Sequence, residues 1–387
     1  MRILHVIATF APAWQYGGPV RSTYELCKAL VARGHHVSVV TTTAGTPMAA
    51  AEGVVCADVE GIDVHYCPAR TGRLGIQSRA MAAEVGDLAP RFDVAHLTGV
   101  WQPTSRRTAA ELARAGVPYV SSPRGALSVY SFSQGRLKKR VYFAAVERGI
   151  QRAAAGLHVT APLEEAEVQR LGLGVPIRVV PNVCSPATWY PDPAAGRSWR
   201  SRNGIPPDAL VASHVGRVQA KKNLEFLAVA AGEVRTGRRW AIVLHGPVAS
   251  RDAAYLRTIE SMFPTGKLVV IAGSGDADEV RGAYSGSDCL AMPSLHENFG
   301  NAAVEAALCG TPVLASPFVG AATILEPRGA ATVLPLEAEP WARAIEAIGE
   351  ARRVRHNERE WVASKVAPDA VAQQMEEFYR EAIGRRQ

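Results

Sequence analysis

Residues 293–313 read PSLHENFGNAAVEAALCGTPV, and they indicate the fold of the chain. The segment just before them, 288–292, is mostly apolar, as expected of a buried strand in a parallel sheet. Asn298, Gly300 and Asn301 then stand where a loop opens a short apolar helix, and a glycine ends that helix before the next strand. Such a strand, glycine loop, helix and second strand predict an α/β fold with a parallel sheet.

Two glutamates frame the start of this helix. Glu297 lies on the loop and Glu305 lies about one turn into the helix, with seven residues between them. Unpaired N–H groups at a helix N-terminus favour an anion, usually a phosphate. A carboxylate only accepts hydrogen bonds, so two of them around a phosphate suit hydroxyl groups on both sides. The pattern predicts that the backbone of Phe299, Gly300 and Asn301 contacts a phosphate, and a ribose, a diphosphate and a sugar fit it.

The surroundings of the two glutamates resemble a known family. The Glu-x7-Glu spacing, the intervening Asn-Phe-Gly and the following Ala-x-x-Gly-x-Pro-Val are similar to the signature of retaining glycosyltransferases of family four. The resemblance covers nearly the whole chain and implies the GT-B fold. In that fold two Rossmann-like domains with doubly wound parallel sheets face each other across a cleft, and a C-terminal helix crosses back onto the first domain. The alternative is that Glu297 and Glu305 are only solvated charges at a helix end, because two glutamates at this spacing are common.

Composition limits the classes of protein. The chain has 387 residues, of which 48% are hydrophobic and 20% charged, enough for two or three globular domains. No apolar run approaches the length that spans a bilayer, and the six cysteines are scattered without C-x-x-C pairs, which favours a cytoplasmic protein. The net charge of +7 suits nucleic acid, an anionic membrane or a polyanionic small substrate. Nucleic acid is not an expected partner, because no zinc-finger or RNP-type motif is present.

A glycine pair follows the first predicted strand, 2–9. Gly17 and Gly18 stand before a helical stretch at 20–30, and the next apolar strand completes a βαβ unit. This unit lacks the G-x-G-x-x-G pattern, which disfavours a nicotinamide enzyme. By the resemblance, Gly17 and Gly18 let the backbone approach the diphosphate of the donor and the acceptor. A loop that only turns the chain is the alternative.

A later predicted strand, 92–97, contains His96 and Leu97 and ends at Thr98, and Trp101 follows. Many family members have His-x-His here, with the second histidine facing the active site, and Thr98 replaces it in this chain. The resemblance makes His96 a candidate catalytic residue, and Thr98 and Trp101 candidates for acceptor binding. A lone histidine in an apolar strand is more often a core residue, or one that supports a site from behind, than a catalyst. Thr98 can donate a hydrogen bond but cannot act as a base near neutral pH.

Arg124 lies in a Ser-Pro-Arg-Gly turn, which resembles family members associated with surface-polysaccharide synthesis. Arg124 is a candidate for binding the donor phosphates or an acidic acceptor, and an exposed turn arginine is the alternative. A long helix is predicted over 134–154, and it opens with the run Arg-Leu-Lys-Lys-Arg at 136–140. This run is either a solvated face or a patch for peripheral contact with anionic lipid at the inner face of the membrane.

Arg217 and Lys222 follow a predicted strand at 210–216. They fit the Gly-Arg-x4-Lys pattern that, by the resemblance, clamps the diphosphate of the donor and stabilises it as it departs. Phosphoryl oxygens suit a planar arginine fork and a mobile lysine charge. No Asp-x-Asp metal motif is evident, so we expect neither a metal nor a cofactor, with these cations and the helix start at Asn301 in place of a divalent ion. Two exposed loop cations are the alternative.

The resemblance divides the chain into an acceptor-binding domain, 1–185 with the C-terminal helix 368–387, and a donor-binding domain, 186–367. Residues 184–207, rich in Pro, Ser and Arg, are expected as a linker. The predicted function is retaining, metal-independent transfer of a hexosyl-type sugar from a UDP- or GDP-sugar to a hydroxyl acceptor. That acceptor is a glycan, a lipid-linked glycan or a small molecule, in bacterial surface-glycan or natural-product synthesis.

By the same resemblance, Glu305 holds the ribose, and Glu297 acts in catalysis on the hydroxyls of the donor sugar. Two other functions stay open. A GT-B sugar-nucleotide epimerase would convert the donor with no acceptor present and would need an acid–base pair at the sugar. A non-catalytic nucleotide-sugar-binding subunit would bind the donor without turnover, and Thr98 in place of the usual histidine favours it.

Overall fold

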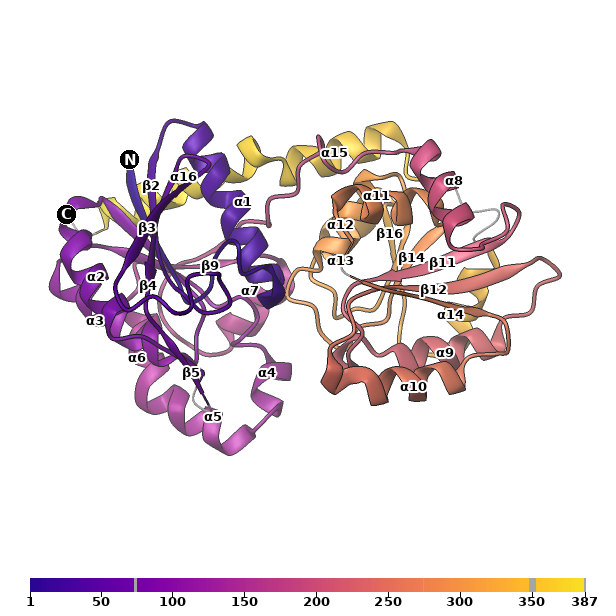
Figure 1. Cartoon of the computed structure of the whole chain (residues 1–387), viewed down its shortest axis with the longest axis horizontal. Helices are drawn as coiled ribbons and strands as arrows, with labels where there is room; N and C mark the ends of the chain where they lie inside the picture. Colours follow the sequence, from indigo (N-terminus) through magenta and orange to yellow (C-terminus); the bar gives the residue numbers. More distant parts are fainter. Residues whose placement is uncertain (73–74, 274, 348–352, 386–387) are drawn as a thin grey trace. The chain divides into compact units, whose positions relative to one another are not determined.

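The structure is a computed structural model that describes residues 1–72, 75–273, 275–347 and 353–385. The chain forms two compact units (Figure 1): Met1–Val183 with Ala367–Gln387 make the first, and Cys184–Val366 make the second. The two divisions lie within two residues of the predicted boundaries. No helix of the described residues is long and apolar enough to cross a bilayer.

The first unit is built on an eight-stranded sheet with the order β10-β9-β8-β7-β1-β2-β4-β3. Neighbouring strands are parallel except β3 and β4, which are antiparallel. The strands are β1 (Arg2–Ile7), β2 (His36–Thr42), β3 (Val55–Val59), β4 (Ile62–Cys67), β7 (Val94–Thr98), β8 (Tyr119–Ser122), β9 (Gly156–Val159) and β10 (Ile177–Val179). Two further strands, β5 (Arg70–Gly72) and β6 (Gly75–Gln77), pair only with each other. The predicted α/β fold is confirmed in this unit.

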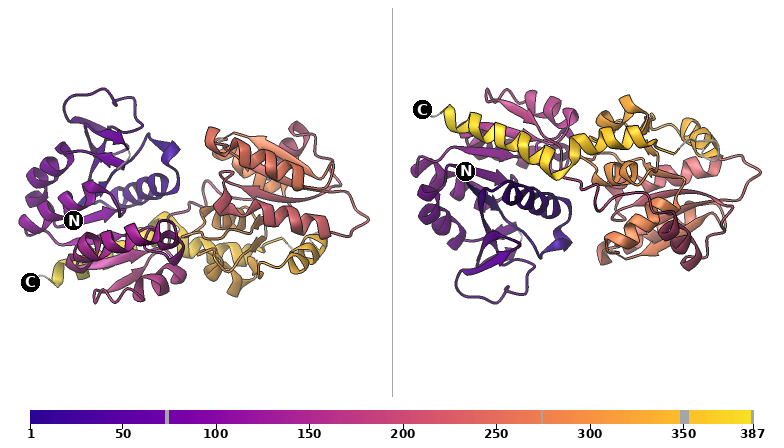
Figure 2. Two further views of the ribbon diagram at one scale, coloured as in Figure 1. Left: turned by 90° about the horizontal axis from the view of Figure 1, so that it is seen from below. Right: turned by 90° about the horizontal axis from the view of Figure 1, so that it is seen from above.

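Helices cover both faces of this sheet because alternate side chains of its strands enter two separate apolar cores. Ile3 and Ile7 of β1 pack in the core that also contains side chains of α1 (Gly18–Ala32) and α16 (Pro368–Gly384). Leu4 and Val6 point into the opposite core. The helices on that side are α2 (Ala80–Leu88), α3 (Pro103–Arg114), α6 (Arg148–Ala153) and α7 (Pro162–Gln169). Figure 2 shows α16, in yellow, lying along the first unit.

The long helix predicted over 134–154 is present as one continuous helical stretch over 136–153, with a short separate helix before it and a π-helical segment within it. Gly135 has a left-handed backbone, with φ 83°, and separates α4 (Val129–Ser133) from α5 (Arg136–Tyr142). A π-helical segment at Phe143–Glu147 then joins α5 to α6. Such segments are uncommon and often lie at functional sites.

The second unit has a six-stranded parallel sheet with the order β13-β12-β11-β14-β15-β16. The strands are β11 (Leu210–Val215), β12 (Trp240–Gly246), β13 (Leu268–Ala272), β14 (Cys289–Met292), β15 (Val313–Ala315) and β16 (Ala331–Val333). Leu224, Ile259 and Trp341 fill one core beside it. They come from α9 (Leu224–Glu233), α10 (Ala253–Met262) and α14 (Ala338–Glu346). The α/β prediction holds for this unit as well.

The predicted linker at 184–207 is wrong for much of its length, because these residues contain α8 (Pro193–Arg202). Trp199 of this helix is fully buried, and a side chain at Gly286 would meet its ring at 2.7 Å. Burial of this tryptophan makes α8 part of the second unit. The remaining helices of the unit are α11 (Ala277–Gly286), α12 (Asn301–Leu308), α13 (Ala322–Leu325) and α15 (His356–Val366). Short 3-10 turns occur at η1 (Trp14–Tyr16), η2 (Ala89–Arg91), η4 (Ala220–Lys222), η5 (Ser250–Asp252) and η6 (Glu326–Arg328).

Each sheet has a point at which the strand order reverses. In the first unit β1 lies between β2 and β7, and in the second unit β11 lies between β12 and β14. In open parallel sheets, ligands bind outside the carboxyl ends of the strands at such a switch point. The loops that follow β1, β7, β11 and β14 are therefore the places to look for function, and they contain most of the predicted site residues.

Candidate functional site

The loops after β11 and β14 in the second unit are bonded to each other. The N–H of Leu295 donates to the carbonyl of Lys221 at 3.0 Å, and the side-chain amide of Asn223 donates to the carbonyl of Pro293 at 3.1 Å. Asn223 has φ 56°, a left-handed conformation that asparagine tolerates better than most residues. These bonds fix the loop bearing the cations against the loop bearing the glutamate.

Lys222 and Glu297 meet at the centre of this arrangement. The Lys222 ammonium donates to Glu297 Oε1 at 2.6 Å, and the two side chains are only 13% and 12% exposed. Burial would raise the pKa of Glu297, but the charges of Lys222 and Lys221 outweigh it and lower that pKa to about 2. Glu297 is therefore ionised throughout the physiological pH range, and the pair is a stable positive–negative contact.

The backbone around Glu297 is held by the segment that follows β15. The Glu297 N–H donates to the carbonyl of Phe318 at 2.8 Å, and the Gly320 N–H donates to the carbonyl of Glu297 at 3.1 Å. Gly300, just before α12, has φ 89°, and a side chain there would meet Val319 at 3.0 Å. Only glycine meets both requirements without strain, so Gly300 sets the position at which α12 begins.

Phe299 and Asn301 complete this loop in different ways. The Phe299 ring is buried in the protein, 2% exposed, and its carbonyl accepts from the Ala321 N–H at 2.7 Å. Phe299 therefore anchors the loop, and a contact to a ligand would come from the backbone. Asn301 is the first residue of α12, so the first turn of that helix carries the positive end of its dipole.

Glu305, on α12, accepts a hydrogen bond from the hydroxyl of Tyr284 at 2.8 Å. Tyr284 is fully buried, and its pKa is raised well above the usual value by burial and by the Glu305 charge. The bond orients the Glu305 carboxylate. No motif in the sequence pointed to Tyr284.

Arg217 differs from the other cations of this loop because it is exposed and has no hydrogen bond or ion pair within the described part of the chain. Gly216 precedes it with φ 146°, and a side chain at Gly216 would lie 3.7 Å from the Lys222 ammonium. His214, on the adjoining strand, is fully buried, and its pKa is lowered to about 4 by burial and by Lys222. Arg217, Lys221 and Lys222 thus bring three positive charges to one strand end, where a diphosphate would find an arginine fork and ammonium groups.

The first unit presents its own set of predicted residues. Gly17 has φ 86° and lies just before α1, which begins at Gly18. Their loop follows β1, so the glycine pair lies at the switch point of this sheet. The position agrees with a close approach of backbone to a ligand, and the contact itself stays a prediction.

His96 is completely buried, and it lies in a layer of aromatic and histidine side chains. Its ring centroid is 4.8 Å from that of His5 and 5.3 Å from that of His158, and its Nδ1 is hydrogen-bonded to the Tyr379 hydroxyl at 2.7 Å. Burial and the neighbouring His5, His158 and Arg124 lower the pKa of His96 well below its usual value. The ring is neutral and out of contact with solvent, so this placement favours a structural role, and a catalytic role stays a prediction.

Thr98 and Trp101 lie at the end of β7 and in the loop after it. Thr98 is 5% exposed, and its hydroxyl oxygen has no hydrogen-bond partner among the described residues. Trp101 has φ 67°, its indole N–H donates to the carbonyl of Ala126 at 2.9 Å, and its backbone N–H donates to Glu147 at 2.9 Å. These bonds hold the tryptophan in an unusual backbone conformation at the wall of a pocket.

Arg124 is not an exposed turn arginine. It has φ 54°, it is half-buried, and its guanidinium donates to the Asn182 side chain at 2.6 Å. The pKa values of His5 and His158 are lowered to about 3, mainly by the burial of both rings and secondly by the positive charge of Arg124. Arg124 therefore supplies a fixed positive charge behind the switch point of the first unit.

The predicted residues thus form two groups, each at the carboxyl ends of its own sheet. Gly17, Gly18, His96, Thr98, Trp101 and Arg124 belong to the first unit, and Arg217, Lys222, Glu297, Phe299, Gly300, Asn301 and Glu305 to the second. Sequence reasoning missed Lys221, His214 and Tyr284. The adjacent lysine pair was a signal for Lys221. His214 lies in an apolar strand and Tyr284 in a helical stretch without a motif, so neither carried a signal.

Two doubly wound α/β units with loops of this kind at their switch points define a protein of the GT-B type. Residues 17–183 match the family described as Glycosyl transferase 4-like domain, and residues 209–351 match Glycosyl transferases group 1. The two matches span most of the chain, which belongs to the glycosyltransferases of family four.

Curated relatives carry glycosyltransferase names. A 2-deoxystreptamine glucosyltransferase of Streptomyces kanamyceticus is 31% identical over 260 residues, which are 63% of this chain and 66% of that protein. A D-inositol 3-phosphate glycosyltransferase of Kineococcus radiotolerans is 32% identical over 194 residues, 48% of this chain and 44% of that protein. The chain thus spans about half the length of the curated relatives it matches.

Solved structures agree on the fold. Sucrose-phosphate synthase from Thermosynechococcus elongatus superimposes with a TM-score of 0.75 at 21% identity, over 99% of both chains. Anabaena Alr3699/HepE in complex with UDP and glucose gives a TM-score of 0.73 at 19% identity, over 98% of this chain and 99% of that one. The predicted GT-B fold is confirmed.

Proposed function

We propose that this protein transfers a hexosyl-type sugar from a nucleoside-diphosphate donor to a hydroxyl acceptor with retention of configuration. The buried Lys222–Glu297 pair carries this proposal, because it lies beside Arg217 and just before the N-terminus of α12. One carboxylate, several cations and a helix dipole at a single switch point match the alternating hydroxyl and phosphate groups of a sugar nucleotide.

In this arrangement Arg217 and Lys222 bind the oxygens of the diphosphate, and α12 adds the partial positive charge of its first turn. The second oxygen of Glu297 accepts from a hydroxyl of the donor sugar. As the bond between the anomeric carbon and the phosphate oxygen breaks, negative charge grows on the phosphate, where the cations are already placed. Glu305, oriented by Tyr284, accepts from the ribose hydroxyls.

A front-face reaction agrees with the residues of the first unit, because it needs no base from the protein. The acceptor oxygen bonds to the anomeric carbon on the face that the phosphate leaves, and its proton passes to the leaving phosphate oxygen. No protein base is then required, which is consistent with Thr98 at the usual histidine position and with the buried, neutral His96. The same cations would perform the work of a divalent metal, so the reaction is proposed to be metal-independent and to need no cofactor.

A UDP- or GDP-sugar is the proposed donor, and a structural neighbour solved with UDP and glucose supports the first of these. The hydroxyl acceptor is a glycan, a lipid-linked glycan or a small molecule. Relatives named for 2-deoxystreptamine and inositol 3-phosphate support acceptors with several hydroxyls. The proposed setting is cytoplasmic, in bacterial surface-glycan or natural-product synthesis, with peripheral contact at the inner face of the membrane through α5.

The test begins with a thermal-shift panel of UDP-, GDP-, ADP- and dTDP-sugars, with and without magnesium. We expect one nucleotide class to raise the unfolding midpoint by several degrees whether or not magnesium is present. Turnover of that donor is then measured for Glu297→Gln and Arg217→Ala, with the exposed Arg257→Ala in α10 as the matched control. Wild-type rates in both site variants would refute the site, and conversion of the donor without any acceptor would instead indicate an epimerase.

A further inference from the structure

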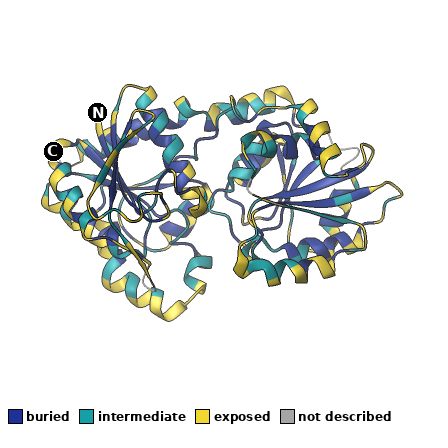
Figure 3. Ribbon diagram, viewed as in Figure 1, coloured by how far each residue is buried: buried dark blue, intermediate teal, exposed yellow. Residues whose placement is uncertain are grey.

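The surface of α5 combines two features that rarely occur together on a solvated helix. Leu137 is 77% exposed and Val141 60% exposed, which are the highest values for large apolar side chains among the described residues, followed by Val129 on α4 at 57%. Leu137 and Val141 are four residues apart, so they lie on one face of the helix. Figure 3 shows this helix largely in the colour of exposed residues.

Positive charges border this apolar stripe. Arg136 and Arg140, also four residues apart, lie on one side of it, and Lys138 lies on the other. All three side chains are exposed, and none forms an ion pair or hydrogen bond within the ranges that the structure describes. Lys139 differs, because its ammonium turns inward and donates to the carbonyl and hydroxyl of Ser131 at 2.7 and 3.0 Å.

The opposite side of α5 is fixed to the first unit by aromatic contacts. The ring of Tyr142 is 6.1 Å from that of Trp101, and Phe143, the next residue, packs edge-on against Phe132 at 5.5 Å. The helix is therefore docked by one face, and the apolar stripe on its other face has no role in that docking. An apolar stripe with unpaired cations on both sides is the composition of a helix that lies in a membrane interface.

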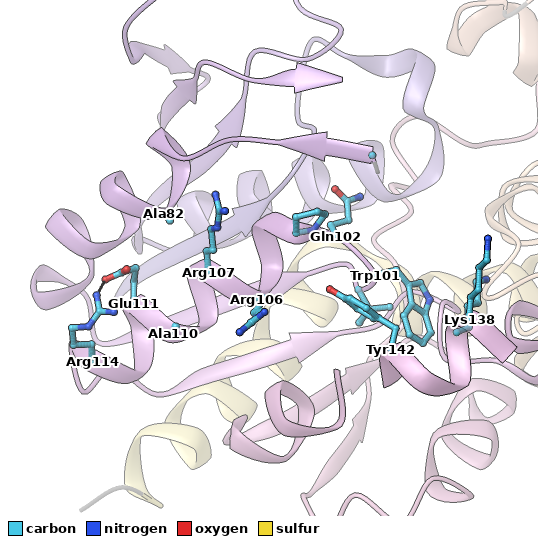
Figure 4. A pocket seen from close by; sticks show the side chains of 14 residues that line it. Ala82, Trp101, Gln102, Arg106, Arg107, Ala110, Glu111, Arg114, Lys138 and Tyr142 are labelled. Atoms are coloured by element: carbon cyan, nitrogen blue, oxygen red, sulfur yellow. Dashed lines mark hydrogen bonds and ion pairs between the residues drawn. The ribbon is translucent and has the colours of Figure 1, made fainter. Parts of the chain in front are cut away.

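A pocket of about 1180 Å³ adjoins the Lys138 edge of the same helix. Arg106 and Arg107 of α3 line it together with Lys138, and the aromatic side chains of Trp101 and Tyr142 form part of its wall (Figure 4). The carboxylate in its lining, Glu111, is paired with Arg114. The pocket thus has an excess of positive charge and an aromatic surface suited to a sugar ring or an alkyl chain.

We propose that α5 docks on an anionic lipid surface, and that the pocket beside it receives the anionic headgroup of an acceptor held in that surface. Leu137 and Val141 enter the boundary of the acyl chains, while Arg136, Lys138 and Arg140 contact headgroup phosphates. The cations lie beside the apolar stripe along the length of one helix, so charged headgroups and acyl chains can contact them at the same time. This arrangement favours a lipid surface over a protein partner. The identification of the pocket's ligand as a sugar acceptor rests on the proposed glycosyl transfer, whereas the docking of α5 on lipid does not.

The first experiment is sedimentation of the full chain with vesicles of equal parts phosphatidylglycerol and phosphatidylcholine, at low and high salt. We expect binding at low salt, weaker binding at high salt, and none to pure phosphatidylcholine. Leu137→Ser with Val141→Ser should weaken binding by about tenfold or more. Replacing Arg136, Lys138 and Arg140 by glutamine should weaken it about 100-fold and remove the salt dependence.

The matched control is Val229→Ser with Met262→Ser, which changes two exposed apolar residues of the second unit and should leave vesicle binding unchanged. Unfolding midpoints equal to that of the wild type show that each variant is folded. The proposal is overturned if the wild type does not bind anionic vesicles, or if the serine variant binds as well as the control. It is also overturned if the serine variant turns a dimer into a monomer, because the stripe would then be an interface between two copies of the chain.

The pocket is tested with decyl phosphate below its micelle concentration and with inorganic phosphate, by isothermal titration. We expect decyl phosphate to bind about tenfold or more tightly than inorganic phosphate, because its chain adds apolar contact. Arg106→Gln with Arg107→Gln should reduce this affinity while vesicle binding persists. Equal affinities for the two probes, or no effect of the double variant, would overturn the assignment of the pocket. Neither experiment uses a sugar donor, so a failure here is separate from a failure of the proposed transfer.

Discussion

At the scale of single residues, the Lys222–Glu297 contact suggests a clear separation of binding from chemistry. Glu297→Gln keeps the shape of the side chain and removes its charge, which leaves the half-buried Lys222 ammonium without its counter-ion. We expect kcat for sugar transfer to fall by about tenfold or more, because the amide no longer accepts the sugar hydroxyl with a full negative charge. The dissociation constant of the free nucleoside diphosphate should stay the same or fall, since Lys222 becomes available to the phosphate.

The control for this variant is Glu260→Gln, an exposed glutamate of α10 that should keep the wild-type kcat. Steady-state kinetics and titration with the nucleoside diphosphate measure the two effects separately. A Glu297→Gln protein that loses nucleotide affinity and kcat in equal measure would contradict the assignment of Glu297 to the sugar.

The buried histidines of the first unit predict a pH dependence of stability. Burial and the Arg124 charge lower the pKa of His5 and His158 to about 3 in the folded protein, against about 6.5 in the unfolded chain. Below pH 6.5 the unfolded state binds these protons and the folded state does not, so stability is lost as the pH falls from about 6.5 towards 3. At pH 5 each histidine should cost about 2 kcal/mol of the free energy of unfolding.

Thermal unfolding between pH 7.5 and 4.5 measures this loss. His158→Gln, which cannot titrate, should have a shallower dependence on pH even if its midpoint at neutral pH is lower. Glu297 contributes little in this window, because its stabilising effect is lost only as the pH falls from about 4.5, the pKa of an unperturbed glutamate, towards its folded pKa of about 2. The buried Glu164 has a pKa raised by burial, which acts in the opposite direction and reduces the slope of the wild type. A His158→Gln protein with the same pH dependence as the wild type would contradict the histidine account.

At the scale of elements, the C-terminal helix α16 is attached to the first unit by a polar contact as well as by its apolar face. Tyr379→Phe removes the hydroxyl that is hydrogen-bonded to His96 Nδ1 and leaves that buried nitrogen without its partner. We expect the free energy of unfolding to fall by about 1–3 kcal/mol, the usual cost of an unsatisfied buried polar group. Urea unfolding measures it.

Tyr16→Phe, at a tyrosine that is 39% exposed, is the matched control and should change stability by less than about 0.5 kcal/mol. A loss as small in Tyr379→Phe would mean that this hydrogen bond contributes little to the position of α16, which is also held by its apolar face and by ion pairs such as Arg33–Glu376.

The strands were predictable from the sequence because they are buried on both faces and read as apolar runs ending in glycine or polar loops, as at 210–216 and 288–292. Helix α8 was not, because a stretch rich in Pro, Ser and Arg gives a loop signal, and only the packing of Trp199 against Gly286 makes it a helix of the unit. The separation of α4 from α5 follows from the left-handed conformation of Gly135, which the local sequence leaves open.

The candidate site was predictable where a motif placed residues directly at strand ends, as for Arg217, Lys222 and Glu297. Their contact was not, since Lys222 and Glu297 are far apart in the chain and meet only because β11 and β14 are neighbours. The sequence also left His96 open between a core and an active-site position, and only its burial between His5 and His158 distinguishes them.

At the scale of the whole molecule, the positive charge of the loop after β11, residues 217–222, predicts that a chelator has little effect on turnover. In the proposed mechanism, Arg217, Lys221 and Lys222 supply the charge that a divalent ion would otherwise bring to the diphosphate. We expect turnover of the preferred donor to be the same with magnesium and with excess EDTA. Loss of activity on chelation, restored by magnesium but not by raised salt, would contradict the metal-independent mechanism.

The order of the two units along the chain has a consequence for biosynthesis. A ribosome makes the residues of the second unit as one uninterrupted stretch, while the first unit waits for α16, which is made after all of them. At about 5–20 residues per second, that wait lasts on the order of ten seconds or more. During it the nascent first unit exposes the apolar surface that Met375 and Phe378 later cover, which makes it the natural client for chaperones. The second unit can finish folding before the first.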